Sequence, residues 1–303
     1  MDSSASAGSL RDPHLRVFMN LMALDSTGPR GSFLERLEGI RAAGFDGVQF
    51  TAFAGREELA DCVSLGSGFA GSGRINLPEE ASPFAERIAG DGYECATLHA
   101  GWGLEDDEQA ARLIQSILTA AQRWRIPLYI ETHRATIFQD MWRTAGFVRR
   151  FPDVRINGDF SHWYTGQEIV YGGFEKKLAF IEPVLERVLF IHGRIGNPGC
   201  MQVRVDPDAA PEPVYVGHFK QLWTAAFRHF LRAASPGDSI YFAPELLAPE
   251  IYYARTFPNR DGVPVEESNR WEQSLLLKQI AEECFQKAKD MVAQDEAAKS
   301  NPF

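Results

Sequence analysis

Short apolar runs alternate with helical patterns along most of the chain, and this alternation constrains the fold more than any other feature. Residues 107–124 place their apolar side chains on one helical stripe. Residues 32–44 show a similar pattern, with Ser32 suited to the N-cap and Gly44 to the end of the helix. Seven runs are predicted to be strands: 16–24, 46–53, 93–101, 126–133, 153–162, 187–194 and 239–247. Nearly continuous apolar strands that alternate with helices are typical of a parallel sheet covered by helices.

Such a sheet either closes into a barrel or stays open. An open dinucleotide-binding sheet carries G-x-G-x-x-G after its first strand, and residues 22–32 lack that motif. The glycine-rich segment 66–73 follows no predicted strand and precedes no Gly-Lys-Ser/Thr, so we interpret it as a flexible loop. The sequence therefore predicts a TIM (β/α)8-type barrel. Since only seven strands are found, an eighth lies within 54–92 or the barrel is irregular there.

The rest of the chain indicates one soluble domain. Residues 1–14, His14 included, are predicted to be a disordered tail, and residues 15–295 a single catalytic domain. The tail lacks the apolar core of a signal peptide, and no apolar run is long enough to span a membrane. The four cysteines are far apart and form no C-x-x-C pair, which argues against a disulfide framework and fits a cytoplasmic protein.

Polar residues that can bind metals follow strand after strand in the second half of the predicted barrel. In chain order they are His99, Glu131 with His133, Asp159 with His162, His192 with Arg194, and Glu245. His99, Glu131, Asp159 and His192 follow one another at intervals of about one strand–helix unit. Because the carboxyl ends of parallel strands meet at one mouth of a barrel, we expect these side chains to converge there.

Four of these residues form a chemically coherent set. Glu131, Asp159, Glu245 and His192 offer three carboxylates and one imidazole, which suits one divalent cation, with Mn²⁺ first and Mg²⁺, Co²⁺ or Zn²⁺ as alternatives. The absence of a thiolate argues against a structural zinc site. Without a cation, three converging carboxylates would repel one another.

From about residue 15 to 290, the chain resembles the xylose isomerase-like TIM barrel superfamily, in particular its sugar and sugar-phosphate isomerase/epimerase branch. The resemblance rests on Glu131, on D-x-x-H at 159–162, on H-x-R at 192–194, and on the Pro-Glu turn at Glu245. It implies that Glu131, Asp159, His192 and Glu245 bind one divalent cation, which would hold adjacent carbonyl and hydroxyl oxygens of the sugar.

The resemblance also implies a reaction. Glu131 and Glu245 would remove and return a proton beside the carbonyl through an enediolate, while His162 and Arg194 would hydrogen-bond the sugar. Other residues are assigned to the substrate from their positions at strand ends, with ordinary packing as the alternative for the two tryptophans: Asn20, His99, Trp102, His133 and Trp163. Substrate specificity is not implied, because residues 54–92 and 196–216 depart from the family pattern.

Four functions remain open. The first is an isomerase or epimerase of a ketose, aldose or keto-polyol, and the second is a lyase or dehydratase that acts on a keto-sugar with the same groups. The third is a DNA repair enzyme related to AP endonucleases, which the net charge of −10 disfavours because it would repel phosphate backbones. The fourth is a non-catalytic sugar-binding barrel. We expect a small-molecule sugar as partner, with no nucleic acid or membrane, and homo-oligomerisation stays open.

Overall fold

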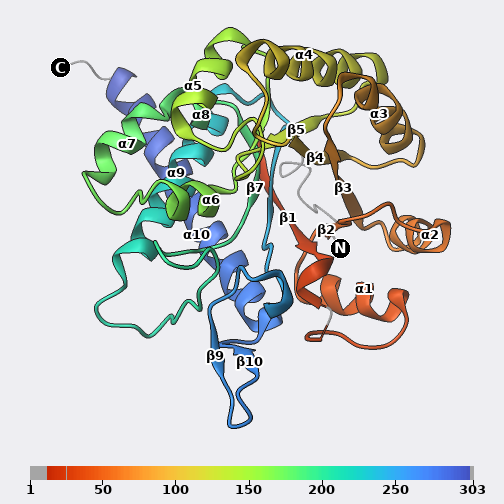
Figure 1. Cartoon of the computed structure of the whole chain (residues 1–303), viewed down its shortest axis with the longest axis vertical. Helices are drawn as coiled ribbons and strands as arrows, with labels where there is room; N and C mark the ends of the chain where they lie inside the picture. Colours follow the sequence, from red (N-terminus) through yellow and green to blue (C-terminus); the bar gives the residue numbers. More distant parts are fainter. Residues whose placement is uncertain (1–11, 25, 301–303) are drawn as a thin grey trace, which may run out of the picture.

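Eight parallel strands form a closed barrel in the computed structural model, which describes residues 12–24 and 26–300 (Figure 1). Each strand pairs with the next one along the chain, and the eighth pairs with the first. The strands are β1 (His14–Asn20), β2 (Gly47–Gln49), β3 (Gly68–Ile75), β4 (Cys95–Ala100), β5 (Leu128–Glu131), β6 (Ile156–Asn157), β7 (Val188–His192) and β8 (Ser239–Ala243). The predicted TIM (β/α)8 barrel is therefore confirmed.

Helices surround the barrel. They are α1 (Phe33–Ala42), α2 (Arg56–Ser64), α3 (Ala81–Gly90), α4 (Asp107–Trp124), α5 (Met141–Arg150), α6 (Phe160–Gly166), α7 (Phe174–Phe180), α8 (Glu182–Leu185), α9 (Val214–Ala233) and α10 (Arg270–Ser300). As predicted, Ser32 caps α1, where it forms a capping box with Glu35, and Gly44 ends the turn that follows with a φ of +81°. Within the described residues, no helix is both long and apolar enough to cross a membrane.

The missing eighth strand is β3, and it includes most of the glycine-rich segment 66–73. The interpretation of this segment as a flexible loop is therefore wrong, and a complete strand–helix unit fills residues 54–92. Gly71 and Gly73 are needed because α3 packs directly on the strand: a Cβ on Gly71 would lie 2.7 Å from Ile88 Cδ1, and one on Gly73 would clash with Phe84. Glycine lets β3 and α3 approach closely, but it also removes the apolar side chains by which a strand is recognised in a sequence.

The first strand begins two residues earlier than predicted. His14, which the sequence analysis assigned to the tail, is the first residue of β1 and lies opposite Ser239 of β8. Its backbone N–H donates to Asp238 O at 3.1 Å, so strand pairing holds it in place. Residues 1–11 lie outside the described residues, and a disordered tail there stays a prediction.

The inside of the barrel has an aromatic layer below a polar one. Phe18, Tyr129, Phe190 and Tyr241 fill its amino-terminal half, where the Phe190 and Tyr241 rings stack at 5.7 Å and Phe18 meets Tyr241 edge to face. Two residues further along three of these strands stand Asn20, Glu131 and His192, which are all buried. Because inward-facing residues recur with a period of two, each of these three strands supplies one side chain to the aromatic layer and one to the polar layer.

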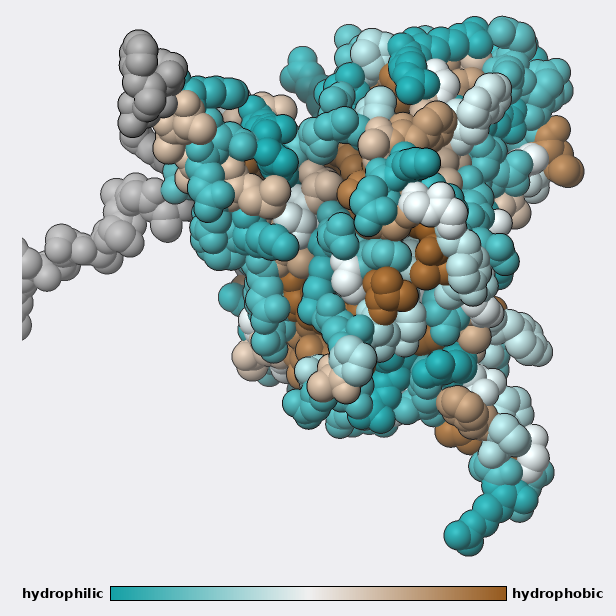
Figure 2. Space-filling model, turned by 90° about the vertical axis from the view of Figure 1, so that its left-hand side faces the viewer, coloured by the Kyte–Doolittle hydropathy of each residue, from teal (hydrophilic) through white to brown (hydrophobic). Residues whose placement is uncertain are grey.

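Two long connections cover one side of the barrel mouth. Residues 196–213 form the predicted excursion, and Gln202 within it bonds to the backbone of Leu247 through both side-chain atoms, at 2.8 and 3.1 Å. Gln202 N–H also donates to Tyr253 O at 3.0 Å. The second connection carries the hairpin of β9 (Thr256–Pro258) and β10 (Pro264–Glu266), which projects from the body as a narrow arm with a hydrophilic tip (Figure 2). The excursion thus anchors the segment that contains Tyr253.

Candidate active site

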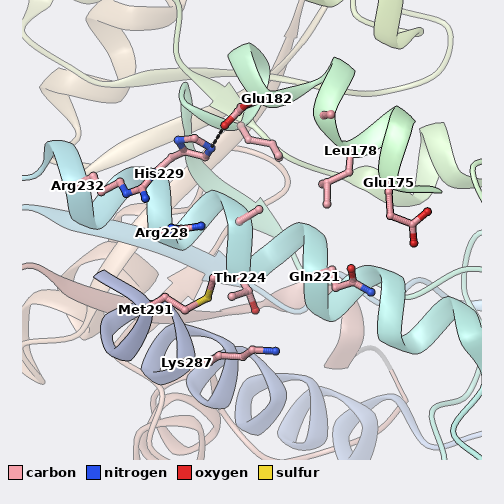
Figure 3. Close-up of a pocket in the computed structure, with 13 residues that line it drawn as sticks. Glu175, Leu178, Glu182, Gln221, Thr224, Arg228, His229, Arg232, Lys287 and Met291 are labelled. Carbon is pink, nitrogen blue, oxygen red and sulfur yellow. Dashed lines mark ion pairs between the residues drawn. The ribbon is translucent and has the colours of Figure 1, made fainter. Parts of the chain in front are cut away.

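One hollow lies outside the barrel, between α7, α8, α9 and α10 (Figure 3). It has a volume of about 480 Å³, and its walls include Arg228, Arg232, Lys287 and the pair of His229 and Glu182, whose nearest charged atoms lie 3.7 Å apart. None of the predicted site residues lines it. The predicted chemistry lies instead at the carboxyl ends of the strands.

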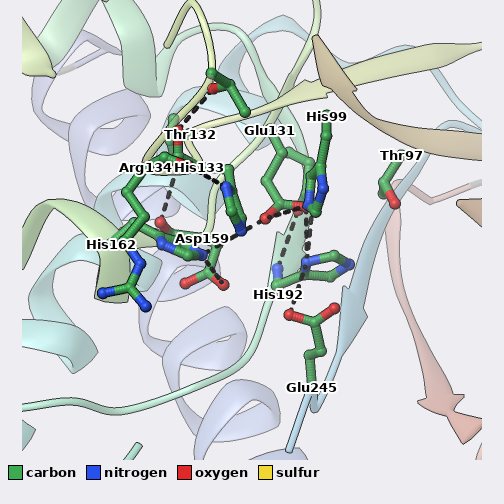
Figure 4. A network of polar contacts seen from close by, with 12 residues as sticks. Thr97, His99, Glu131, Thr132, His133, Arg134, Asp159, His162, His192 and Glu245 are labelled. Carbon is green, nitrogen blue, oxygen red and sulfur yellow. Dashed lines mark hydrogen bonds and ion pairs between the residues drawn. The ribbon is translucent and has the colours of Figure 1, made fainter. Parts of the chain in front are cut away.

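The four predicted metal ligands lie together at that mouth (Figure 4). Glu131 ends β5, Asp159 follows β6, His192 ends β7 and Glu245 follows β8. One donor atom of each lies within 4.8 Å of a donor atom of every other. Glu131, Asp159 and His192 are buried, whereas the side chain of Glu245 is 14% exposed and opens toward the pocket. The convergence expected from strand-end placement is therefore present, and occupancy by an ion stays a prediction.

The donor set fits a divalent cation. His192 Nδ1 lies 3.2 Å from Glu131 Oε2 and 3.4 Å from Glu245 Oε2, which are separations that ligands of one ion have. Glu131 Oε1 is buried and, although His99 Nε2 lies 3.3 Å away, accepts no hydrogen bond of suitable geometry within the described residues. A buried carboxylate oxygen without a donor is costly, and a cation would satisfy it. Three carboxylate donors and one imidazole favour a hard ion.

Arg194 supplies a fixed positive charge beside these carboxylates. Its Nη2 contacts Asp159 Oδ2 and lies 3.0 Å from Glu245 Oε2, while its Nε donates to Ser161 Oγ at 3.1 Å. Burial would raise the pKa of Asp159, but Arg194 and then His162 outweigh it, so that this pKa is lowered. The Nη1 group is buried and has no hydrogen-bond partner in the described part of the chain. Its N–H groups are therefore not used by the described part of the protein.

The remaining oxygen of Asp159 organises the local backbone. Oδ1 accepts from Ser161 N at 3.0 Å and from Ser161 Oγ at 2.6 Å, so Asp159 is the N-cap of α6. The helix that starts there places His162 three residues later, with Nε2 3.5 Å from Asp159 Oδ2. The D-x-x-H spacing thus corresponds to about one helical turn, which brings the imidazole of His162 next to the carboxylate of Asp159.

Two amides that the sequence analysis did not identify hold His192. Gln49 lies within 3.1 Å of Nε2, and Asn157 Nδ2 lies 3.0 Å from Nδ1 and from Glu131 Oε2. Burial would lower the pKa of His192, but the carboxylates of Glu245 and Glu131 outweigh it and raise this pKa to about 9. Amides that fix a ring in this way also set its tautomer, which is how outer partners prepare a histidine ligand.

Three histidine rings pack in a row along one wall of the site, tilted against one another. His133 lies between His99 and His162, with ring centroids 4.0 and 3.9 Å away. Burial lowers the pKa of His133 to about 4 and that of His162 well below its usual range, so both rings are neutral. Burial would also lower the pKa of His99, but Glu131, 3.3 Å away, raises it. Tyr253 meets the His162 ring edge-on and lies 3.3 Å from His133 Nε2 through its hydroxyl.

A pocket of about 260 Å³ opens onto this cluster. It is smaller than the ~300–1,000 Å³ of sites that hold drug-sized ligands, so it suits a compact molecule such as a sugar. Its polar walls are formed by Glu131, His192, Glu245 and His99, together with Arg74 and Ser72 of β3 and with Thr51, which follows β2. Predicted ligands and one predicted substrate residue, His99, therefore share one accessible space.

Among the other predicted substrate residues, His162, Arg194 and His133 lie beside the predicted ligands without lining the pocket, and three more lie elsewhere. Trp163 is fully buried in the core, where its Nε1 donates to Phe138 O at 2.9 Å, because the first turn of α6 points it away from the mouth. Trp102 is 49% exposed on the connection after β4 and lines a separate surface hollow. Asn20 is buried below the pocket, where it donates to Gln49 Oε1 at 2.9 Å. Trp163 therefore packs in the core, Trp102 lies outside this pocket and Asn20 lies beneath it, and a contact of any of the three with substrate stays a prediction.

Four residues at the site were not identified from the sequence. Gln49 and Asn157 stand inside apolar strands, where a polar residue is itself the signal, because a buried amide needs partners. Arg74 was hidden by the interpretation of 66–73 as a loop. Tyr253 lies in the irregular segment after β8, and no sequence pattern marks it.

Comparisons with solved structures support the fold. A D-tagatose 3-epimerase-like protein aligns over 91% of this chain and 99% of its own, with a TM-score of 0.56 and 11% identity. The probable 3-DHS dehydratase AsbF, involved in petrobactin synthesis in Bacillus anthracis, covers 76% of this chain and 92% of its own (TM-score 0.53, 13% identity). A xylose isomerase-like TIM barrel protein from Mycobacterium smegmatis, solved with magnesium, covers 89% and 97% (TM-score 0.52, 14% identity).

No protein-family model matches the chain, and no curated protein matches it. At 11–14% identity, the structural matches establish the architecture and leave the activity to the residues of the site. The chain has the fold of the xylose isomerase-like TIM barrels, as the sequence resemblance predicted.

Proposed function

We propose that this protein is a divalent-cation-dependent enzyme that moves a proton at the carbon beside a carbonyl group of a sugar, as an isomerase or epimerase. The convergence of Glu131, Asp159, His192 and Glu245 carries the proposal, because one donor atom of each lies within 4.8 Å of all the others. Their three carboxylates and one imidazole favour Mn²⁺ or Mg²⁺. The fold it shares with a D-tagatose 3-epimerase-like protein and with a barrel solved with magnesium supports the same reading.

The bound cation would act as a Lewis acid at the carbonyl oxygen and stabilise the negative charge of the enediolate. The protein supplies the proton transfers. Glu131 and Glu245 belong to β5 and to the end of β8, so their carboxylates approach a substrate from different strands. One removes the proton from the carbon and the other returns a proton to the neighbouring carbon or to the opposite face. Nη1 of Arg194, which has no hydrogen-bond partner among the described residues, would donate to a substrate oxygen.

Metal content and isotope exchange test this proposal. Purified protein should hold about one equivalent of divalent cation, and Asp159→Ala should lose it. A keto-sugar incubated in deuterated water should acquire deuterium at the reacting carbon only with the metal-loaded wild type. Full metal content in Asp159→Ala would contradict the site. Turnover with no exchange from solvent would instead favour a hydride shift between the two carbons.

A dehydratase is the second candidate, favoured by the fold shared with the probable 3-DHS dehydratase AsbF and by the position of His99. The His99 side chain is 34% exposed in the pocket and contacts Glu131. After a glutamate removes the proton beside the carbonyl, His99 could protonate a β-hydroxyl group, which leaves as water while a C=C bond forms. An unsaturated product that absorbs in the ultraviolet would identify this reaction, and a stereoisomer of unchanged mass would identify the first.

The biological setting is also proposed from the sequence. With a net charge of −10, a small-molecule partner is favoured over nucleic acid, and the protein would act in the cytoplasm. A DNA-cleavage assay on abasic duplexes checks the repair alternative, which predicts metal-dependent nicking. Light scattering gives the oligomeric state, which the residues do not specify.

A further inference from the structure

Arg74 is a positive charge at the mouth of the barrel that the proposed chemistry does not use. It belongs to β3 and lines the pocket together with Glu131, His192 and Glu245. Gly73 faces outward onto α3, so the alternation of side chains along the strand turns Arg74 toward the mouth. The residue is exposed, and a ligand in the pocket can reach it.

The position of Arg74 relative to the metal ligands is set by the sheet. Arg74 lies opposite His99 of β4, and the pairing of Leu98 with Ile130 places Glu131 of β5 next in the same row. Neighbouring strands lie about 4.8 Å apart, so roughly 10 Å separates the backbone at Arg74 from that at Glu131. A single sugar-sized molecule can therefore touch the metal ligands at one end and Arg74 at the other.

The charge of Arg74 is not neutralised by the protein. Nη1 donates to Gly101 O at 2.7 Å, and no carboxylate lies within 4 Å of its guanidinium among residues 12–24 and 26–300. The carboxylate of nearby Glu105 is instead bound to the N–H groups of Trp102 and Gly103, both at 2.8 Å. Most of the guanidinium thus remains available to an anion.

The charged groups of the proposed cation site do not neutralise Arg74 either. Glu131, Asp159 and Glu245 would carry three negative charges, which a divalent cation and Arg194 together balance. Arg74 then leaves the loaded pocket with a net positive charge, although the chain as a whole carries −10. An uncharged sugar would leave this charge unanswered, and an acidic one would complement it.

We propose that the substrate is a sugar acid, a polyhydroxy carbonyl compound that carries a carboxylate, and that Arg74 binds this carboxylate. The inference rests on the proposed function, because it places the reacting end of the substrate at the metal ligands. A carboxylate matches the planar fork of one guanidinium. A phosphate group commonly draws several positive charges or a helix N-terminus, and the described lining of this pocket holds no lysine and no arginine besides Arg74.

Calorimetry with magnesium-loaded protein and two matched ligands tests this without requiring turnover. D-gluconate and D-glucitol have the same carbon skeleton and differ in the carboxylate. Wild type should bind D-gluconate about ten- to a hundredfold more tightly, which is the contribution of one charged hydrogen-bonded pair. Arg74→Gln should remove this preference, Arg74→Lys should keep part of it, and neither should change the binding of D-glucitol. Arg112→Gln, an exposed site on α4 outside this pocket, is the matched control.

Several results would overturn the assignment. If Arg74→Gln bound D-gluconate like wild type, the carboxylate would be held elsewhere. Equal losses for both ligands would mean that Arg74 only supports the backbone at Gly101. Tighter binding of D-glucitol 6-phosphate, lost in Arg74→Gln, would assign the residue to phosphate. Full metal content in Asp159→Ala would refute the proposed cation site, whereas an unchanged preference for D-gluconate in Arg74→Gln would refute only the assignment of Arg74, so the two failures are distinguishable.

Discussion

The metal-free protein should lose stability as the pH rises through the range in which His192 gives up its proton. Burial opposes the charge on this ring, but Glu245 and Glu131 raise its pKa to about 9 from the ordinary value of 6.5. A group whose pKa is raised by folding contributes to the free energy of unfolding. This contribution is complete below pH 6.5 and disappears as the pH passes 9. The difference corresponds to roughly 3 kcal/mol.

Urea unfolding of chelator-treated protein at pH 6.5 and pH 9 measures this loss. The pKa of His99 is also raised, so His99 contributes in the same direction and must be subtracted. His192→Gln provides the subtraction, because it keeps His99 and removes only the titrating ring. Wild type should lose about 3 kcal/mol more than this variant over that range. Parallel pH profiles for the two proteins would refute the reasoning.

Metal binding should show the opposite pH dependence. If Nδ1 of His192 is the donor, a cation must displace its proton, so the affinity for Mg²⁺ should rise about tenfold per pH unit up to pH 9. Titration calorimetry in buffers of different ionisation enthalpy would count the proton released. Binding without proton release at pH 7 would show that His192 is not a ligand.

Three further variants probe the supports of the site. Gln49→Leu removes a partner of His192 Nε2 and should weaken metal binding about ten- to a hundredfold in competition titrations, without changing the stoichiometry. Trp163→Phe leaves Phe138 O without its donor and should lower the free energy of unfolding by about 1–3 kcal/mol, with kcat and KM unchanged, whereas a substrate contact would raise KM. Gly73→Val forces a side chain against α3 and should cost about 1–3 kcal/mol or more in chemical denaturation, and an unchanged midpoint would contradict the close packing of β3.

Strand-end spacing predicted the convergence of Glu131, Asp159, His192 and Glu245 because sheet topology fixes it. Residues that end successive parallel strands must meet at one mouth, whatever the connecting segments do. The same argument could not predict where the side chain of a residue beyond the end of a strand would point. Trp163 follows Asp159 closely, but the helix that starts there turns it into the core.

Strand β3 was missed for a different reason. A strand is recognised in a sequence by its apolar side chains. Gly71 and Gly73 have none, because α3 packs directly against the backbone of the strand at these positions. That requirement comes from α3 and is visible only in three dimensions. The error propagated to the site, because it also concealed Arg74. Tyr253 could not be predicted at all, since Gln202, 51 residues away in the sequence, bonds to its backbone.

The aromatic layer in the lower half of the barrel has a consequence for the order of events. Phe18, Tyr129, Phe190 and Tyr241 close the floor beneath the polar residues, so the site is a well with one opening. A cation held by Glu131, Asp159 and His192 would lie deeper than a sugar in the pocket above. A sugar bound in the pocket would therefore block the path by which the cation leaves. Metal exchange should stop while substrate is bound, and a protein purified with ligand in place should resist chelators.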